Sequence, residues 1–156
     1  MTIRSLTETL PEHPFFQGFD PAVIELLAGC ARNIHLRPDE LVFRTGEPAQ
    51  HFYLIREGRI ALQVPELSGG SSIIDTVEAG DVLGVSWLVP PYRWLFDARA
   101  TVETRAVSFD AECLRAKCEA DPAVGYAVLT RVAHIMHRRL EAARMRMLDV
   151  YGVRRA

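Results

Sequence analysis

The hydrophobic pattern divides the chain into three segments. Between residues 13 and 33 apolar positions recur at helical spacing, and Asp20-Pro21 has the composition of a helix N-cap and first turn. From residue 34 to residue 110 the period falls to about two, in short runs separated by Gly, Pro and Asp. From residue 111 to residue 151 the helical period returns. We therefore expect N-terminal helices, a β-roll and C-terminal helices in a single domain over residues 1–156.

The predicted fold class is α+β. About eight short strands, spaced about ten residues apart, favour an antiparallel β-barrel or jelly roll. Gly58 lies between two apolar runs and is typical of a tight hairpin, because glycine accepts a positive φ. Asp110 and Asp121 are the expected N-caps of two C-terminal helices, of which the second is long.

The long C-terminal helix carries an apolar stripe that extends beyond what one small core can cover. Its spacing of three and four residues approximates a coiled-coil seam, so we expect a homodimer that pairs through this helix. Packing of the helix against its own domain is the alternative, and it applies to the first half of the helix in either case. The predicted pairing residues are Val128, Val132, Ile135, Leu140, Ala143 and Met147.

The strongest candidate for a binding site is the segment from Gly80 to Thr101. A Gly80-Asp81 turn leads to Gly84, and the next five residues are sufficient for one helical turn before Pro90 and Pro91 end it. A short helix that starts at a glycine exposes backbone N–H groups, which can bind an anion. The segment is therefore either a phosphate cradle or an ordinary surface loop.

Composition and charge narrow the functional classes. The chain has 156 residues, of which 49% are hydrophobic, and a formal net charge of −2. This charge argues against a general nucleic-acid binder. The sequence has neither a membrane-spanning apolar run nor the apolar core of a signal peptide, so we expect a cytoplasmic protein without a membrane partner. Its cysteines, Cys30, Cys113 and Cys118, are expected to be free, buried thiols.

The sequence contains no candidate for catalysis and no metal site. The glycine patterns of a nucleophile elbow, a Walker loop and a dinucleotide fingerprint are all missing. His134 and His137 have a spacing that suits a metal, but two ligands are too few, and a solvated helix surface is the better interpretation.

The spacing of several glycines resembles that of the cyclic nucleotide-binding domain family, in particular Crp/Fnr-type sensor domains. Gly46-Glu47 precedes a strand containing Tyr53 and Ile55, Gly58 turns the next hairpin, and Gly80-Asp81 leads to Gly84. The resemblance extends from about His13 to Leu148. It implies that residues 80–99 are the phosphate-binding cassette of that family. It also implies that the cassette contacts the hinge before the C-terminal helices.

The side chains of the cassette depart from the family pattern. The resemblance implies a glutamate after the cassette glycine, for the ribose, and a later arginine for the cyclic phosphate. Val85 stands at the glutamate position, and the arginine position falls on Trp94 or, in another register, on Ala98. An unpaired buried phosphate costs several kcal/mol, and a lost ribose acceptor adds about 1 to 3 kcal/mol. We therefore expect no binding of cyclic AMP or cyclic GMP in the usual pose.

Aromatic residues are concentrated in the same segment. They can stack on a different ligand, such as a larger nucleotide, or they can fill the vacated pocket or form a protein-contact patch. The aromatic residues are Trp87, Tyr92, Trp94 and Phe96. The candidate ligand-binding residues of the cassette are Gly84, Val85, Ser86, Trp87, Arg93, Trp94, Arg99 and Ala100.

Three functions remain open at the level of the sequence. The first is a stand-alone, non-enzymatic sensor or regulatory module, in which binding at the cassette shifts the C-terminal helices. The second is an accessory subunit of a multi-subunit redox enzyme, because the segment SWLVPPYRW…FDARA resembles small proteins of this fold that accompany nicotinamide-linked hydrogenases. That function would use the cassette to dock on a larger protein or to contact a dinucleotide. The third is a cyclic nucleotide binder in which Arg93 or Arg99 pairs with the phosphate. DNA binding is not expected, because the sequence ends near the end of the long helix.

Overall fold

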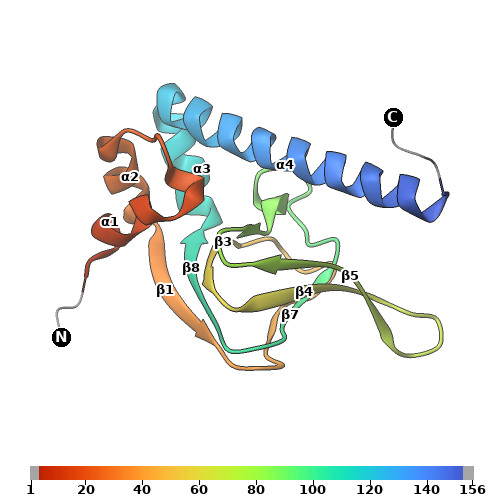
Figure 1. The fold of residues 1–156 in the computed structure, drawn as a ribbon. Coiled ribbons are helices and arrows are strands. Elements are labelled where there is room, and N and C mark those ends of the chain that lie inside the picture. Colours follow the sequence, from red (N-terminus) through yellow and green to blue (C-terminus); the bar gives the residue numbers. More distant parts are fainter. Residues whose placement is uncertain (1–3, 153–156) are drawn as a thin grey trace.

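The computed structural model describes residues 4–152 and consists of two β-sheets with a helical layer at one end (Figure 1). Each sheet has four strands, and the strand pairs of the described residues are antiparallel, in the orders β1-β8-β3-β6 and β2-β7-β4-β5. The sheets face each other without closing into a barrel, so the jelly-roll form of the prediction is confirmed. The strands are β1 Ala31–Leu36, β2 Leu41–Phe43, β3 His51–Glu57, β4 Arg59–Pro65, β5 Ser71–Glu78, β6 Val82–Leu83, β7 Asp97–Ala100 and β8 Thr104–Asp110.

The helical layer is made from both ends of the chain. The N-terminal part comprises α1 Leu6–Thr9, the 3₁₀ helices η1 Leu10–Glu12 and η2 Pro14–Phe16, and α2 Pro21–Ala28. The C-terminal part comprises α3 Ala111–Ala120 and α4 Pro122–Val150, and a third 3₁₀ helix, η3 Val85–Trp87, lies between β6 and β7. The Asp20, Asp110 and Asp121 side chains each accept a backbone N–H at the start of their helix, as expected for N-caps.

Two expected boundaries are corrected by the structure. The N-terminal helices span residues 6–28 rather than 13–33, and β1 begins at Ala31 because pairing with β8 starts at Ala31 opposite Phe109. Residues 97–110 form two strands that belong to different sheets. β7 pairs with β2 and β4 in one sheet, whereas β8 pairs with β1 and β3 in the other.

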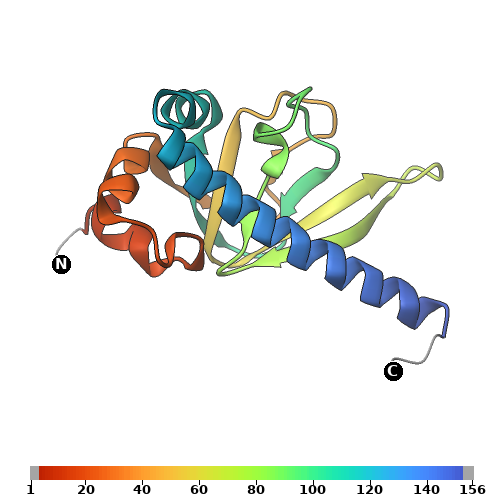
Figure 2. The same cartoon turned by 90° about the horizontal axis from the view of Figure 1, so that it is seen from above.

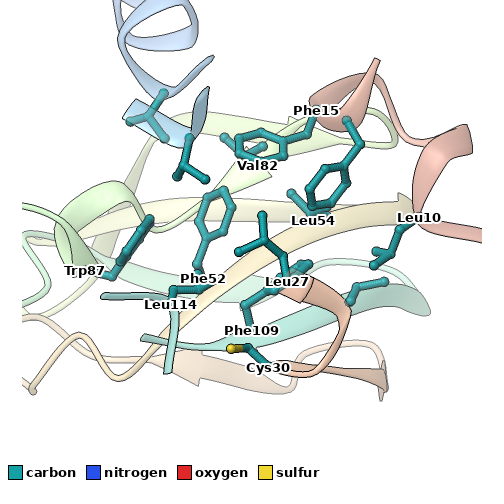
Figure 3. Packing of buried hydrophobic residues seen from close by; sticks show 14 of the residues in the cluster. Leu10, Phe15, Leu27, Cys30, Phe52, Leu54, Val82, Trp87, Phe109 and Leu114 are labelled. Carbon is teal, nitrogen blue, oxygen red and sulfur yellow. The ribbon is translucent and has the colours of Figure 1, made fainter. Parts of the chain in front are cut away.

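Two hydrophobic clusters hold these layers together. One lies between the two sheets and includes Ile55, Ile60 and Trp94. The other lies between the β3–β8 sheet and the helices, where Phe15, Leu27, Phe52, Trp87 and Leu114 converge (Figure 3). We call them the inter-sheet core and the helical core.

Helix α4 crosses the helical layer and then continues beyond it, where Arg146 is paired with Asp75 of β5 at 3.4 Å (Figure 2). Its first half is buried through Val124, Val128 and Val132. Arginines of α4 also bind backbone carbonyls of the domain: Arg131 donates to the carbonyls of Pro14, Phe15 and Gln17 in the N-terminal segment, and Arg139 donates to the carbonyl of Val82.

Cys30 and Cys113 form a disulfide, so the expectation of three free cysteines is wrong for this pair. The two residues are 83 apart in sequence, but the pairing of β1 with β8 brings them together. Cys30 immediately precedes β1, Asp110 ends β8 and donates its N–H to the Cys30 carbonyl (2.9 Å), and Cys113 lies in the next helical turn. Cys118 is a free cysteine.

Candidate functional site: the cassette

The cassette turns sharply where β6 ends. Gly84 has φ +89° and caps the 3₁₀ helix Val85–Trp87, which is one short turn rather than the longer turn expected up to Val89. A cis peptide joins Pro90 to Pro91. Beyond it the chain runs alongside the loop before β3, where Trp94 N–H donates to the Glu47 carbonyl (3.0 Å) and Gly46 N–H donates to the Trp94 carbonyl (2.8 Å). The two ends of the cassette therefore lie on different parts of the fold.

The indole ring of Trp94 occupies the space beneath the cassette glycine. The Trp94 side chain is buried and stacks on Phe43 of β2, with ring centroids 3.8 Å apart and planes within 9°. A β-carbon at Gly84 would lie 2.7 Å from two carbons of this ring. Gly84 is therefore needed twice, once for its positive φ and once because a side chain would collide with Trp94.

Trp87 points the other way, into the helical core, where its side chain is fully buried beside Phe52 (Figure 3). Its Nε1 has no hydrogen-bond partner among the described residues. Its carbonyl accepts from Arg115 of α3 (2.6 Å), and the same guanidinium lies 4.5 Å above the Tyr92 ring. Arg115, which the sequence analysis did not identify, thus joins α3 to both sides of the Pro90-Pro91 turn.

The two arginines considered for the phosphate are engaged with backbone carbonyls. Arg93 donates to the Gly46 carbonyl (2.8 Å) and Arg99 to the Asp39 carbonyl (2.7 Å). Val85 and Ser86 are half-buried in η3, and Ala98 and Ala100 are fully buried in β7. The structure thus brings Gly84 and Trp94 together and places Ala100 in the inter-sheet core with Trp94. Trp87, Arg93 and Arg99 lie in separate surroundings.

The pairing residues predicted on α4 divide into two groups. Val128, Val132 and Ile135 pack into the helical core, whereas Leu140, Ala143 and Met147 are exposed. The exposed residues belong to a longer stripe with alternating steps of four and three, the a/d spacing of a coiled coil. This exposed seam comprises Leu129, Ala133, Met136, Leu140, Ala143, Met147 and Val150. The first half of this seam cannot be recognised from the sequence, because the buried and exposed stripes both have helical spacing and differ only in burial.

A groove of about 690 Å³ lies between α4, the N-terminal segment and the first residues of the cassette. It is lined by Phe15, Gly80, His134, Arg138 and Arg139, among others. Arg131 and Arg139, which contribute positive charge to this groove, donate hydrogen bonds to backbone carbonyls and so hold α4 against the domain. His134 and His137 are exposed, and the described residues form no cluster of three His, Cys, Asp or Glu that could hold a metal.

Within residues 4–152, no helix combines the length and the apolar character that crossing a bilayer requires.

Comparison with known proteins identifies the family. Residues 33–121 match the family described as the cyclic nucleotide-binding domain. The CRP-like cAMP-activated global transcriptional regulator of Mycobacterium tuberculosis is 25% identical over 133 residues, which are 85% of this chain and 59% of that protein. The chain thus spans about three-fifths of the length of this relative.

Two solved structures share the fold. A cyclic nucleotide-binding protein of Geobacter metallireducens superposes with a TM-score of 0.78 at 26% identity, covering 89% of this chain and 99% of that one. A cyclic nucleotide-binding-like protein of Brucella abortus gives a TM-score of 0.60 at 29% identity, covering 74% and 99%. With more than half of its residues matched to the family and its fold shared with these structures, the chain belongs to the cyclic nucleotide-binding domain family.

Proposed function

We propose that this protein is a non-enzymatic regulatory module whose cassette is closed by Trp94 and does not bind cyclic AMP or cyclic GMP in the usual way. The observation that carries the proposal is the packing of the Trp94 ring between Gly84 and Phe43. A ligand that entered beneath Gly84 would have to displace a buried indole ring. Truncation of such a side chain costs about 3–5 kcal/mol, and displacement opposes binding by a similar amount. The proposed location is the cytoplasm.

The polar groups around the cassette support the same proposal. A bound phosphate needs a cationic partner, and charge-assisted hydrogen bonds are roughly twice as strong as neutral ones. Arg93 and Arg99 are the arginines of the cassette, but their guanidinium groups donate to backbone carbonyls of Gly46 and Asp39. If either arginine turned toward a ligand, its carbonyl would lose that hydrogen bond. The Val85 side chain offers no acceptor to a ribose hydroxyl.

The test is a thermal-shift and calorimetric titration with cyclic AMP and cyclic GMP. We expect no shift for the wild-type protein, whereas a ligand at 100 times its Kd would stabilise the fold by about 2.7 kcal/mol. The double variant Val85→Glu/Trp94→Arg removes the ring and supplies both missing side chains, so it should gain binding. Leu95→Arg adds the same charge one residue away, on an exposed side chain, and is the matched control. Binding by the wild type would overturn the proposal.

We further propose that the module is a homodimer that pairs through the exposed seam of α4. Support comes from seven exposed residues at a/d spacing on a helix whose second half extends beyond the core. Leu140→Arg should convert the dimer to a monomer in light scattering, because it puts a charge at the centre of the seam. Leu148→Arg makes the same change one residue outside the seam and should leave the dimer intact. A monomeric wild type would contradict this proposal.

An accessory subunit of a larger redox complex remains the second candidate. It is favoured by the tip of the cassette, where Val89 and Leu95 are 62% and 70% exposed and Pro90 and Pro91 are also exposed. A large partner that co-purifies stoichiometrically from the source organism with the wild type, but not with Val89→Asp/Leu95→Asp, would support this function. Co-purification that the double substitution leaves unchanged would exclude the tip as the docking face.

A further inference from the structure

The disulfide lies at a junction between the sheet, the helical layer and the cassette. Cys30 lies between α2 and β1, immediately before Ala31, and Cys113 lies in the first turn of α3. Cys30 is buried at the lower edge of the helical core near Phe109 in Figure 3. The bond therefore ties the start of α3 to the start of β1.

We propose that Cys30 and Cys113 are a reversible dithiol–disulfide site whose redox state controls the mobility of the cassette through α3. The reactant class is a thiol–disulfide couple, either a low-molecular-weight thiol or a dithiol oxidoreductase. This site does not depend on whether a nucleotide binds.

The exposure of the two sulfur-bearing residues suits thiol–disulfide exchange. Cys30 is 8% exposed, whereas Cys113 is half-buried, so an external thiolate has its access on the Cys113 side. In reduction, a first external thiolate forms a mixed disulfide and releases one protein thiolate, which takes up a proton. A second external thiolate then releases the other protein thiolate and leaves as the oxidised reagent. Two electrons pass to the protein, and two S–H groups replace one S–S bond.

The connection from the disulfide to the cassette runs through α3. Arg115 is two residues after Cys113, and it donates to the Trp87 carbonyl (2.6 Å) and stacks on the Tyr92 ring. Leu114, between them, is buried in the helical core with Trp87. A displacement of the first turn of α3 would therefore act on both ends of the segment from Trp87 to Tyr92.

The remaining attachments of the first turn of α3 are hydrogen bonds and local packing. Ala111 N–H donates to the Gln50 carbonyl (2.9 Å), and the Asp110 carboxylate accepts the N–H of Cys113 (2.8 Å). The disulfide is the covalent cross-link at this end, closing a loop across a sequence separation of 83. Its reduction should lower the Tm by roughly 5 to 15 °C, as for other long cross-linked loops in domains of this size.

Cys118 provides an internal control on the same helix. Burial, followed by the charge of Glu119, raises the pKa of this thiol, which slows its alkylation near neutral pH. Cys118→Ser should therefore preserve the redox response, whereas Cys113→Ser should abolish it.

The first experiment equilibrates the protein with mixtures of reduced and oxidised glutathione, followed by alkylation and mass spectrometry. As the mixture becomes more oxidising, we expect Cys30 and Cys113 to become resistant to alkylation together, because they form the disulfide. Reduction should make both thiols reactive again, while Cys118 is alkylated throughout. Three alkylated cysteines in every mixture would overturn the proposal, and so would a bond that forms only between molecules.

The second experiment measures amide hydrogen exchange of the oxidised and reduced wild-type protein, which needs no substitution. We expect reduction to accelerate exchange in residues 85–92 by roughly tenfold or more, while the β4–β5 hairpin stays unchanged. In Arg115→Met the disulfide should still form, but its reduction should no longer change exchange in residues 85–92. Exchange in the wild-type cassette that does not respond to reduction would overturn the coupling.

Discussion

The two tryptophans of this protein lie in one short cassette but belong to different halves of the fold. Trp87 is fully buried in the helical core, among side chains from α2, α3, α4 and β3. Trp94 is buried in the inter-sheet core, where it stacks on Phe43 and lies beneath Gly84. The Trp87 side of the cassette is therefore coupled to the helices, and the Trp94 side is part of the sheet packing.

This difference explains how a cassette can retain its backbone path after its ligand contacts have changed. The inter-sheet core supplies a side chain, Trp94, that fills the space beneath Gly84. The helical core holds the rest of the cassette through Trp87 and Arg115. On this account, signals pass between the cassette and α3 at the Trp87 end, while the Trp94 end stays fixed.

The largest expected effect comes from removing either ring. Trp87→Ala and Trp94→Ala should each lower the free energy of unfolding by about 3–5 kcal/mol, because each leaves a cavity in a packed core. Chemical denaturation measures the loss. Amide hydrogen exchange distinguishes the two variants. Trp87→Ala should accelerate exchange in α3 and α4, and Trp94→Ala should accelerate exchange in β2 and β7. Equal loosening of both layers by each variant would contradict the division into two cores.

A smaller effect should separate backbone strain from contact with Trp94. Gly84 and Gly80 both have φ +89°, but a β-carbon at Gly80 would meet only a side-chain atom of Pro14, at 3.6 Å. Gly80→Ala should therefore cost about 1 kcal/mol of stability, from strain alone. Gly84→Ala should cost about 2–4 kcal/mol, since the Trp94 ring must also move. Equal losses would show that Trp94 does not fill this space in solution.

The link between α3 and the cassette should contribute less. Arg115→Met removes a part-buried, charge-assisted hydrogen bond to the Trp87 carbonyl and the contact with the Tyr92 ring. We expect a loss of about 1–3 kcal/mol in denaturation. Arg105→Met removes an exposed arginine whose ion pair with Glu57 spans 3.7 Å, and it should cost less than about 1 kcal/mol.

The smallest expected effect is a pH dependence in the helical layer. Burial lowers the pKa of His13 below its usual value of 6.5. Its Nδ1 accepts the Phe15 N–H (3.1 Å) and its Nε2 lies 3.0 Å from the Ile55 carbonyl, an arrangement that suits a neutral ring with the proton on Nε2. Because the folded pKa is the lower one, the unfolded chain binds more protons, and stability falls as the pH drops below 6.5.

Urea denaturation at about pH 7.5 and pH 5.5, on either side of the ordinary histidine pKa, measures this loss. His13→Asn retains an acceptor for the Phe15 N–H but cannot titrate in this range, so its stability should change less between the two pH values. An unchanged difference would assign the pH dependence to other groups.

Much of the fold could be predicted from the sequence because its signals are local. The N-caps at Asp20, Asp110 and Asp121, the hairpin at Gly58 and the change of hydrophobic period near residue 110 each depend on neighbours in the chain. The boundaries were less accurate, since the start of β1 at Ala31 depends on its pairing with β8, which is distant in sequence.

The features of the site that were missed depend on contacts across the fold. Nothing in the sequence spacing shows that Trp94 lies against Phe43, that Arg115 reaches the Trp87 carbonyl or that Cys30 meets Cys113. The exposed seam of α4 was half predicted, because Leu129 and Met136 share the helical period of the buried residues beside them. Burial, which the sequence does not contain, separates the two stripes.

The most direct test of the closed cassette is the solvent accessibility of Trp94 itself. Trp87→Phe leaves Trp94 as the sole tryptophan, because the chain has two. Its fluorescence should resist quenching by acrylamide and iodide, and should not change on addition of cyclic AMP, as expected for a ring that is 5% exposed. Ready quenching in the folded protein, or a change in emission that saturates with cyclic AMP, would show that the cassette is open and would contradict the account.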